Sequence, residues 1–194
     1  ETNGFAGASD RHSLKGSEMS QEAAATNEAQ VEAQANDRAG KYLTFVLAEE
    51  EYGLEILKVR EIIGMMDITA VPRTPTHVKG VINLRGKVIP VVDLRLKFGM
   101  PEAEHTEETC IIVVDVCGME MGIIVDRVSE VLDILGEEID DAPSFGTSVD
   151  TEFILGMGKC EGRVTILLDI SKVLGAAELA ALNSQMPAEE PVED

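Results

Sequence analysis

Short apolar runs alternate with turn residues along the middle of the chain, between residues 41 and 175. Turn signals recur about every 8 to 12 residues, which is typical of an all-β sandwich or barrel. Strands are expected at 42–47, 52–54, 59–65, 80–84, 87–93, 110–116, 119–125, 128–134, 153–157 and 163–169. Helical spacing of apolar residues occurs only near the end, where Val173, Leu174, Ala177 and Ala181 predict a C-terminal helix over about 170–182.

The two ends of the chain differ in composition from the middle. Residues 1–40 are rich in Ala, Glu, Gln, Asn and Ser, so they cannot bury enough apolar surface to offset the entropy of ordering. Residues 186–194 are acidic and interrupted by proline. We therefore expect a disordered tail at each end. Two alternatives stay open for residues 1–18: native sequence, or an added leader before a natural start at Met19.

The middle of the chain repeats itself. Segment 52–62 (YGLEILKVREI) matches 121–131 (MGIIVDRVSEV), so that a glycine, a valine and a glutamate coincide. Five further residues, Gly80, Gly86, Val88, Asp93 and Gly99, align with Gly156, Gly162, Val164, Asp169 and Gly175. The repeat predicts a duplicated fold, with one small barrel over 41–105 and a second, carrying the C-terminal helix, over 106–185. Because each copy is too short for a large core, apolar contact between the barrels should stabilise both.

Charge narrows the range of partners. The chain has 36 acidic and 16 basic residues, a net charge of −20, which argues against binding nucleic acid or an anionic membrane surface. Residues 41–100 carry 9 bases and 7 acids, whereas 101–175 carry 4 bases and 17 acids. The longest apolar stretch, 110–125, is broken by Asp115 and Glu120, so no direct membrane insertion is expected. Three cysteines without a CxxC spacing fit a reducing, cytoplasmic environment.

No local motif for catalysis or cofactor binding is complete. Residues 80–87, GVINLRGK, resemble a phosphate-binding loop, but five residues separate the glycines and Val88 replaces the required Ser or Thr. The histidines have no nearby partner for metal binding or general-base chemistry, and no GxSxG motif is present. The sequence therefore predicts a non-enzyme with no cofactor and no metal, whose surface binds other proteins.

Two side chains lie where a partner contact would use them. Arg85 is at an expected turn, at the position that Glu161 occupies in the second copy. It is either a solvated cation or a fixed donor to a partner's carboxylate or carbonyl. Phe145 is in an acidic loop, where its ring either folds back onto the barrel or anchors a partner. Met65 and Met66, taken alone, favour core packing over a contact surface.

Over about residues 40–185 the chain resembles the CheW-like family of bacterial chemotaxis coupling proteins. The likeness rests on four ordered blocks: FVLAEEEYGLEILKVREI, VKGVINLRGKVIPVVDLRLKFG, GIIVDRVSEVL and TEFILGMGKCEGRVTILLDISKVL. It implies an all-β fold of two intertwined SH3-like five-stranded barrels. It also implies a non-catalytic adaptor, monomeric when free, that ties the cytoplasmic tips of methyl-accepting chemoreceptors to the regulatory domain of the histidine kinase CheA. The alternative is an adaptor of a type IV pilus or other non-flagellar chemosensory pathway.

The resemblance also implies which residues bind each partner. The receptor-binding residues would be Val59, Glu61, Asn83, Leu84, Arg85 and Ile111. The kinase-binding residues would be Ile63, Met65, Met66 and Ile68, with Phe145 in a second, ring-forming contact to the kinase regulatory domain. On this assignment a receptor helix lays its apolar side on the aliphatic residues, and Arg85 fixes its register.

Overall fold

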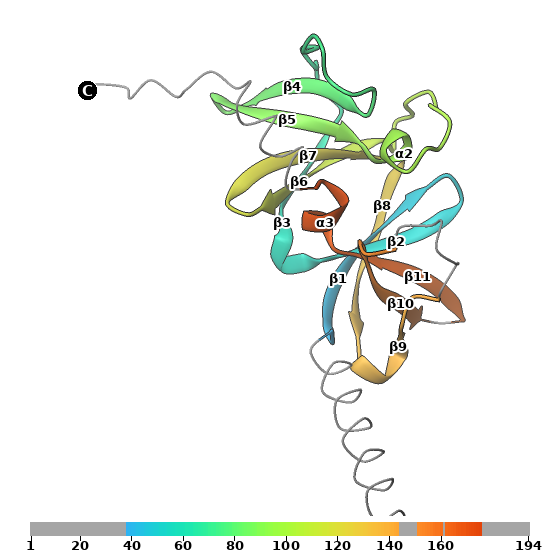
Figure 1. Ribbon diagram of the computed structural model, residues 1–194. Coiled ribbons are helices and arrows are strands. Elements are labelled where there is room, and N and C mark those ends of the chain that lie inside the picture. The colour runs from blue at the N-terminus through green and yellow to red at the C-terminus, as the bar shows by residue number, and fades with distance from the viewer. Residues whose placement is uncertain (1–37, 144–150, 161, 176–194) are drawn as a thin grey trace, which may run out of the picture.

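The computed structural model describes residues 38–143, 151–160 and 162–175. They form two β-sheets and four short helices (Figure 1). The predicted acidic tail, nearly all of the predicted N-terminal tail, the end of the predicted C-terminal helix, and Phe145 and Glu161 lie outside the described residues.

The described strands are β1 (Gly40–Leu47), β2 (Glu50–Glu55), β3 (Val59–Gly64), β4 (Val78–Leu84), β5 (Lys87–Asp93), β6 (Cys110–Val116), β7 (Met119–Val125), β8 (Arg127–Ile134), β9 (Ile139–Asp140), β10 (Ile154–Cys160) and β11 (Arg163–Leu168). The short helices are η1 (Ile56–Lys58), α2 (Leu94–Lys97), η2 (Gly136–Glu138) and α3 (Ile170–Val173). Every predicted strand is present: β5, β6 and β7 have the predicted bounds, and the ends of the others differ by at most three residues. Strand β9 was not predicted, because two residues are too few to show an alternating pattern.

The two copies of the repeat exchange their first hairpins. One sheet has the order β8-β1-β2-β11-β10-β9 and the other has the order β3-β6-β7-β5-β4. The repeat aligns β1 to β5 with β6, β7, β8, β10 and β11, so each sheet takes two of these strands from one copy and three from the other, and the six-stranded sheet adds β9 at its edge. The copies are joined in each sheet by one parallel pairing, β2 with β11 or β5 with β7, and by one antiparallel pairing, β1 with β8 or β3 with β6. Figure 1 shows β1 and β2, in blue, beside the orange β10 and β11.

The sheets therefore do not follow the expected division at residue 105, because both draw strands from each side of it. The connections explain the exchange. Only η1 joins β2 to β3, and only Asp126 joins β7 to β8. Connections this short carry the chain straight on into the other sheet, since they leave no room to return beside the preceding hairpin. The result is an all-β fold that fits two intertwined SH3-like barrels, here called the five-stranded and six-stranded barrels.

Apolar side chains form one core inside each barrel and a larger core between them. The core of the five-stranded barrel contains Ile82, Ile89, Val91, Ile111, Val113 and Ile124. The core of the six-stranded barrel contains Tyr42, Ile134, Ile139 and Leu167. The central core draws on both sheets, for example through the fully buried Phe45 and Ile112. The expected apolar contact between the barrels is thus the main core of the protein.

Candidate partner-binding site

Several of the predicted receptor residues gather at one end of the five-stranded barrel. Val59 and Glu61 lie at the start of β3, while Asn83, Leu84 and Arg85 lie at the end of β4 and in the turn that follows. Strands β3 and β4 are the two edges of this sheet, and a salt bridge between the Arg85 guanidinium and the Glu61 carboxylate joins them. The curl of the sheet therefore brings two separate sequence motifs together.

The β4–β5 turn holds Arg85 in a defined position. Arg85 and Gly86 both have positive φ, 53° and 88°, as the tight turn of a two-residue hairpin requires. The backbone N–H of Gly86 donates to Oδ1 of Asn83 at 2.8 Å, so Asn83 stabilises the turn. The Arg85 side chain remains 73% exposed. The turn and the salt bridge to Glu61 place the guanidinium at the end of the barrel, and its role as a donor to a partner stays a prediction.

Ile111, unlike Arg85, is not exposed to solvent. Its side chain is fully buried in the core of the five-stranded barrel, and Leu84 is partly buried against the same core. Ile111 therefore supports the site from below, and its side chain offers no surface to a partner. The sequence did not reveal this, because both faces of β6 are buried and alternation does not separate them.

A second hairpin tip, which the sequence analysis did not single out, lies at the same end of the barrel. In the β6–β7 turn, Cys117 and Gly118 have φ values of 53° and 85°, and the N–H of Gly118 donates to Oδ1 of Asp115 at 2.9 Å. The two tips therefore have the same construction. The signal was present in the sequence: each tip has an Asn or Asp three residues before a glycine.

Three ion pairs link the strands and turns at this end of the barrel. Besides Arg85 and Glu61, Nη2 of Arg60 lies 2.5 Å from Oδ2 of Asp115, and Nζ of Lys87 lies 3.0 Å from Oε2 of Glu120. We call these six residues the ion-pair ring. The basic side chains are 54–73% exposed, whereas their acidic partners are 24–33% exposed. The basic groups are therefore the more exposed members of the ring.

The pKa of Asp115 provides a test of the ring. The hydrogen bond from Arg60 and, next, that from the backbone of Gly118 lower the pKa of the Asp115 carboxyl. A lowered pKa in the folded state means that the pair stabilises the fold above the ordinary carboxyl value of about 4. That contribution is lost as the pH falls through the lowered pKa. We expect Arg60→Gln to raise the pKa of Asp115 toward its ordinary value in an NMR titration.

The control for this titration is Lys79→Gln, which removes the hydrogen bond from Lys79 that lowers the pKa of Glu102. It should leave the pKa of Asp115 where it is in the wild type. An unchanged Asp115 titration in Arg60→Gln would show that the Arg60–Asp115 pair does not form in solution.

The predicted kinase residues continue from β3 into the following loop. Ile63, Met65 and Ile68 are partly buried against the core of the five-stranded barrel, whereas Met66 is 37% exposed. Ile62, which the sequence analysis did not single out, is 45% exposed. Exposed apolar area in this region therefore comes mainly from Met66 and Ile62. Phe145 is outside the described residues.

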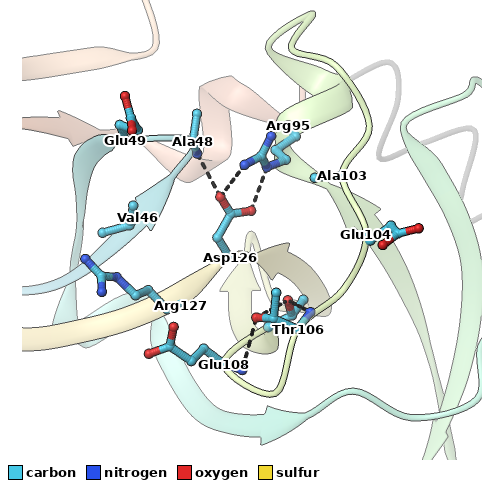
Figure 2. A pocket seen from close by; sticks show the side chains of 11 residues that line it. Val46, Ala48, Glu49, Arg95, Ala103, Glu104, Thr106, Glu108, Asp126 and Arg127 are labelled. Carbon is cyan, nitrogen blue, oxygen red and sulfur yellow. Dashed lines mark hydrogen bonds and ion pairs between the residues drawn. The ribbon is translucent and has the colours of Figure 1, made fainter.

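A cavity of about 580 Å³ lies where the β1–β2 turn, α2 and the β7–β8 junction meet (Figure 2). The Asp126 carboxylate accepts hydrogen bonds from Nε and Nη2 of Arg95, both at 2.6 Å, and from the N–H of Ala48 at 2.8 Å. Both carboxylate oxygens are thus engaged in tying the turn to α2. Among the residues described, no group of three or more His, Cys, Asp or Glu is arranged to hold a metal ion. None of the helices described is long and apolar enough to cross a bilayer.

The fold is a duplicated β-barrel whose candidate site is an exposed surface with three ion pairs. Comparisons with known proteins show the family to which the chain belongs. A family model described as the CheW-like domain matches residues 41–178. The chain therefore belongs to the CheW-like family, and the resemblance seen in its four sequence blocks is confirmed.

Similar proteins bear related names. "Chemotaxis protein CheW" of Klebsiella aerogenes is 42% identical over 144 residues, which cover 74% of this chain and 87% of that protein. "Chemotaxis protein CheW" of Bacillus subtilis is 37% identical over 135 residues, covering 69% and 86%. The crystal structure of the scaffolding protein TtCheW from Thermoanaerobacter tengcongensis matches with a TM-score of 0.66 at 37% identity, over 72% of this chain and 95% of that one.

Proposed function

We propose that this chain is a non-catalytic chemotaxis adaptor that couples the cytoplasmic tips of methyl-accepting chemoreceptors to the kinase CheA. The observation that carries the proposal is the meeting of Glu61 on β3 with Leu84 and Arg85 at the end of β4. Val59, which packs against the central core, begins the same strand β3. The names of the relatives, chemotaxis proteins in each case, favour this role over a pilus-type pathway. The adaptor works at the cytoplasmic side of the membrane, through its partners.

The receptor surface combines apolar area with a directed cation. A receptor helix lies on the aliphatic parts of Val59 and Leu84, and the Arg85 guanidinium donates to a carboxylate or carbonyl of that helix. Helix recognition of this kind uses apolar anchors, while a charged rim residue sets register and specificity. A contact that must respond to signals suits a Kd in the micromolar range, about −8 kcal/mol. Repetition of such contacts in an array supplies the remaining strength.

The kinase surface lies beyond the other end of β3. Val59 begins this strand, and Met66 lies two residues beyond its last residue, Gly64. The seven-residue separation corresponds to roughly 20 Å along an extended chain, so the two partners do not compete for the same surface. The regulatory domain of CheA contacts Ile63, Met65, Met66 and Ile68. Phe145 makes the second, ring-forming contact to the same domain.

Arg85→Glu tests the receptor surface. Reversing the charge removes the donor and places two carboxylates side by side at Glu61, so affinity for a receptor signalling fragment should fall at least tenfold, because the variant repels the carboxylate or carbonyl that Arg85 binds. Isothermal titration calorimetry measures this affinity. The melting temperature and the affinity for the CheA regulatory domain should change little.

Two matched variants complete the test. Lys41→Glu makes the same charge change at an exposed ion pair of the six-stranded barrel, Lys41 with Asp133, and should leave both affinities intact. Met66→Glu should weaken kinase binding and spare receptor binding. Equal receptor affinity for Arg85→Glu, Lys41→Glu and the wild type would refute the proposed receptor surface.

A further inference from the structure

We infer that the β6–β7 turn forms a second part of the receptor contact, where the ion-pair ring binds an acidic and partly apolar segment of the receptor helix. The inference rests on the proposed function and extends its contact surface to Arg60, Cys117 and Lys87. None of these residues was among the predicted site residues.

The first argument is position. The order β3-β6-β7-β5-β4 places the β6–β7 hairpin between β3 and the β4–β5 hairpin, and both turns lie at the left end of this sheet in Figure 1. Two ion pairs of the ring connect this hairpin to its neighbouring strands. Arg60 of β3 pairs with Asp115 of β6, and Lys87 of β5 pairs with Glu120 of β7. A helix seated on the Arg85 turn therefore has the Cys117 turn as a neighbouring, equally fixed surface.

The second argument is charge. Each basic side chain of the ring is more exposed than the carboxylate with which it pairs. The outer surface is thus positive in a protein whose net charge is −20. Such a local reversal of sign attracts an acidic segment of a partner. Leu57, immediately before Lys58 and 88% exposed, adds apolar area at the same end of the sheet.

The third argument is the comparison between the two copies of the repeat. At the positions of Arg60 and Asp115 the other barrel has Ser129 and Val46, so the corresponding pair is missing there. Arg163 and Glu51, equivalent to Lys87 and Glu120, are 3.8 Å apart. The six-stranded barrel folds with the same strand order without a complete ring. The fold alone therefore does not require the ring.

Cys117 allows a direct test with the full chain. It is exposed, whereas Cys110 is buried and Cys160 is partly buried. In a Cys160→Ser background, fluorescein maleimide attached to Cys117 should lower the affinity for a receptor signalling fragment at least tenfold. The control carries the same label at Glu49→Cys, in the β1–β2 turn of the other barrel, in a Cys117→Ser, Cys160→Ser background. It should change that affinity less than twofold.

A charge variant keeps the test independent of the bulk of the label. Arg60→Glu should weaken receptor binding about tenfold by removing a cation from the contact and repelling the acidic segment. Arg60→Lys should retain most of the affinity. Lys79→Glu, the same charge change in the exposed pair with Glu102 near the opposite end of β4, should have little effect. Melting temperatures of all variants establish that the fold is retained.

The outcomes separate this inference from the proposed function. Loss of receptor binding on labelling Cys117 and in Arg60→Glu, with both controls intact, supports the inference. If Arg85→Glu weakens binding while the Cys117 label and Arg60→Glu do not, the inference is overturned and the proposed receptor surface stands. If the wild type does not bind the receptor fragment, the proposed function fails, and the inference fails with it.

Discussion

Replacing Gly80 with alanine should lower the free energy of unfolding by about 3 kcal/mol or more, which is exceptional for the addition of one methyl group. Gly80 has φ of +140°, a conformation that is essentially restricted to glycine. A Cβ at this position would lie 2.1 Å from the carbonyl oxygen of Thr69. Thr69 cannot withdraw freely, because it exchanges two backbone hydrogen bonds of 2.9 Å with Val81. Urea unfolding followed by circular dichroism measures the loss.

Gly86→Ala is the matched control for this prediction. Gly86 also has positive φ, +88°, but nothing lies within 4 Å of a Cβ built there. Its replacement should cost only about 1 kcal/mol, since the strain of the backbone is the sole penalty. Equal losses for Gly80→Ala and Gly86→Ala would mean that the contact with Thr69 does not constrain the fold.

Gly80→Ala should also affect the kinase surface. The Thr69–Val81 bridge fixes the loop that follows β3, and this loop carries Met65, Met66 and Ile68. Any folded fraction of the variant should therefore bind the CheA regulatory domain less well, while the receptor surface at the other end of β3 is retained. Binding of both partners by calorimetry at low temperature, where the variant is folded, distinguishes these effects.

The second large effect is expected for Asp126→Ala, which should destabilise the protein by about 2 to 3 kcal/mol. The Arg95 and Asp126 side chains are only 18% and 29% exposed, and they form two hydrogen bonds of 2.6 Å. Removing the carboxylate leaves a largely buried guanidinium without its partner and frees the N–H of Ala48. Part of the burial penalty is relieved by solvent, so the value lies below that of a fully buried pair.

The position of Asp126 adds to this effect. It is the single residue between β7 of one sheet and β8 of the other, and its partners come from the β1–β2 turn and from α2. Both sheets therefore depend on it. Hydrogen exchange should show faster exchange of the Ala48 amide in Asp126→Ala, and urea unfolding measures the stability.

Two variants control the Asp126 prediction. Asp133→Ala removes an exposed pair with Lys41, whose side chains are 60% and 63% exposed, and should cost about 0.5 kcal/mol. Combining Arg95→Met with Asp126→Ala should recover part of the lost stability, because an apolar side chain leaves no buried charge. A loss in Asp126→Ala no larger than that in Asp133→Ala would contradict the buried-pair argument.

The repeat was visible in the sequence, but the structural reason for its shared glycines was not. The match between Gly80 and Gly156 was visible in the letters alone, but its cause was not. Both glycines lie inside strands, β4 and β10, where another segment crosses closely: Thr69 over Gly80, and β9 beside Gly156. A Cβ at Gly156 would lie 2.8 Å from the carbonyl oxygen of Asp140. The equivalence of these crossings became clear only when the strands were paired.

The candidate site, too, was predicted in part from the sequence and in part seen only in the structure. The family resemblance named Arg85 and Glu61 as residues of one surface, and the structure joins them by a salt bridge. The family resemblance also named Ile111, which the structure shows to be fully buried. Arg60, Asp115 and Cys117 were not named, because nothing in their local sequence shows that the β6–β7 turn lies beside β3.

Strand positions, the repeat, the family and the tight turns were determined by the sequence alone, since alternation, glycines and Asn or Asp residues act over a few neighbouring residues. The exchange of hairpins, the burial of Ile111 and the closure of the ion-pair ring were decided only by the tertiary structure. Strand pairing depends on contacts between distant segments, and the same alternating pattern is compatible with several partners. In this protein β2 pairs not only with β1 but also with β11, more than 100 residues later, and the core of each barrel contains residues of both copies.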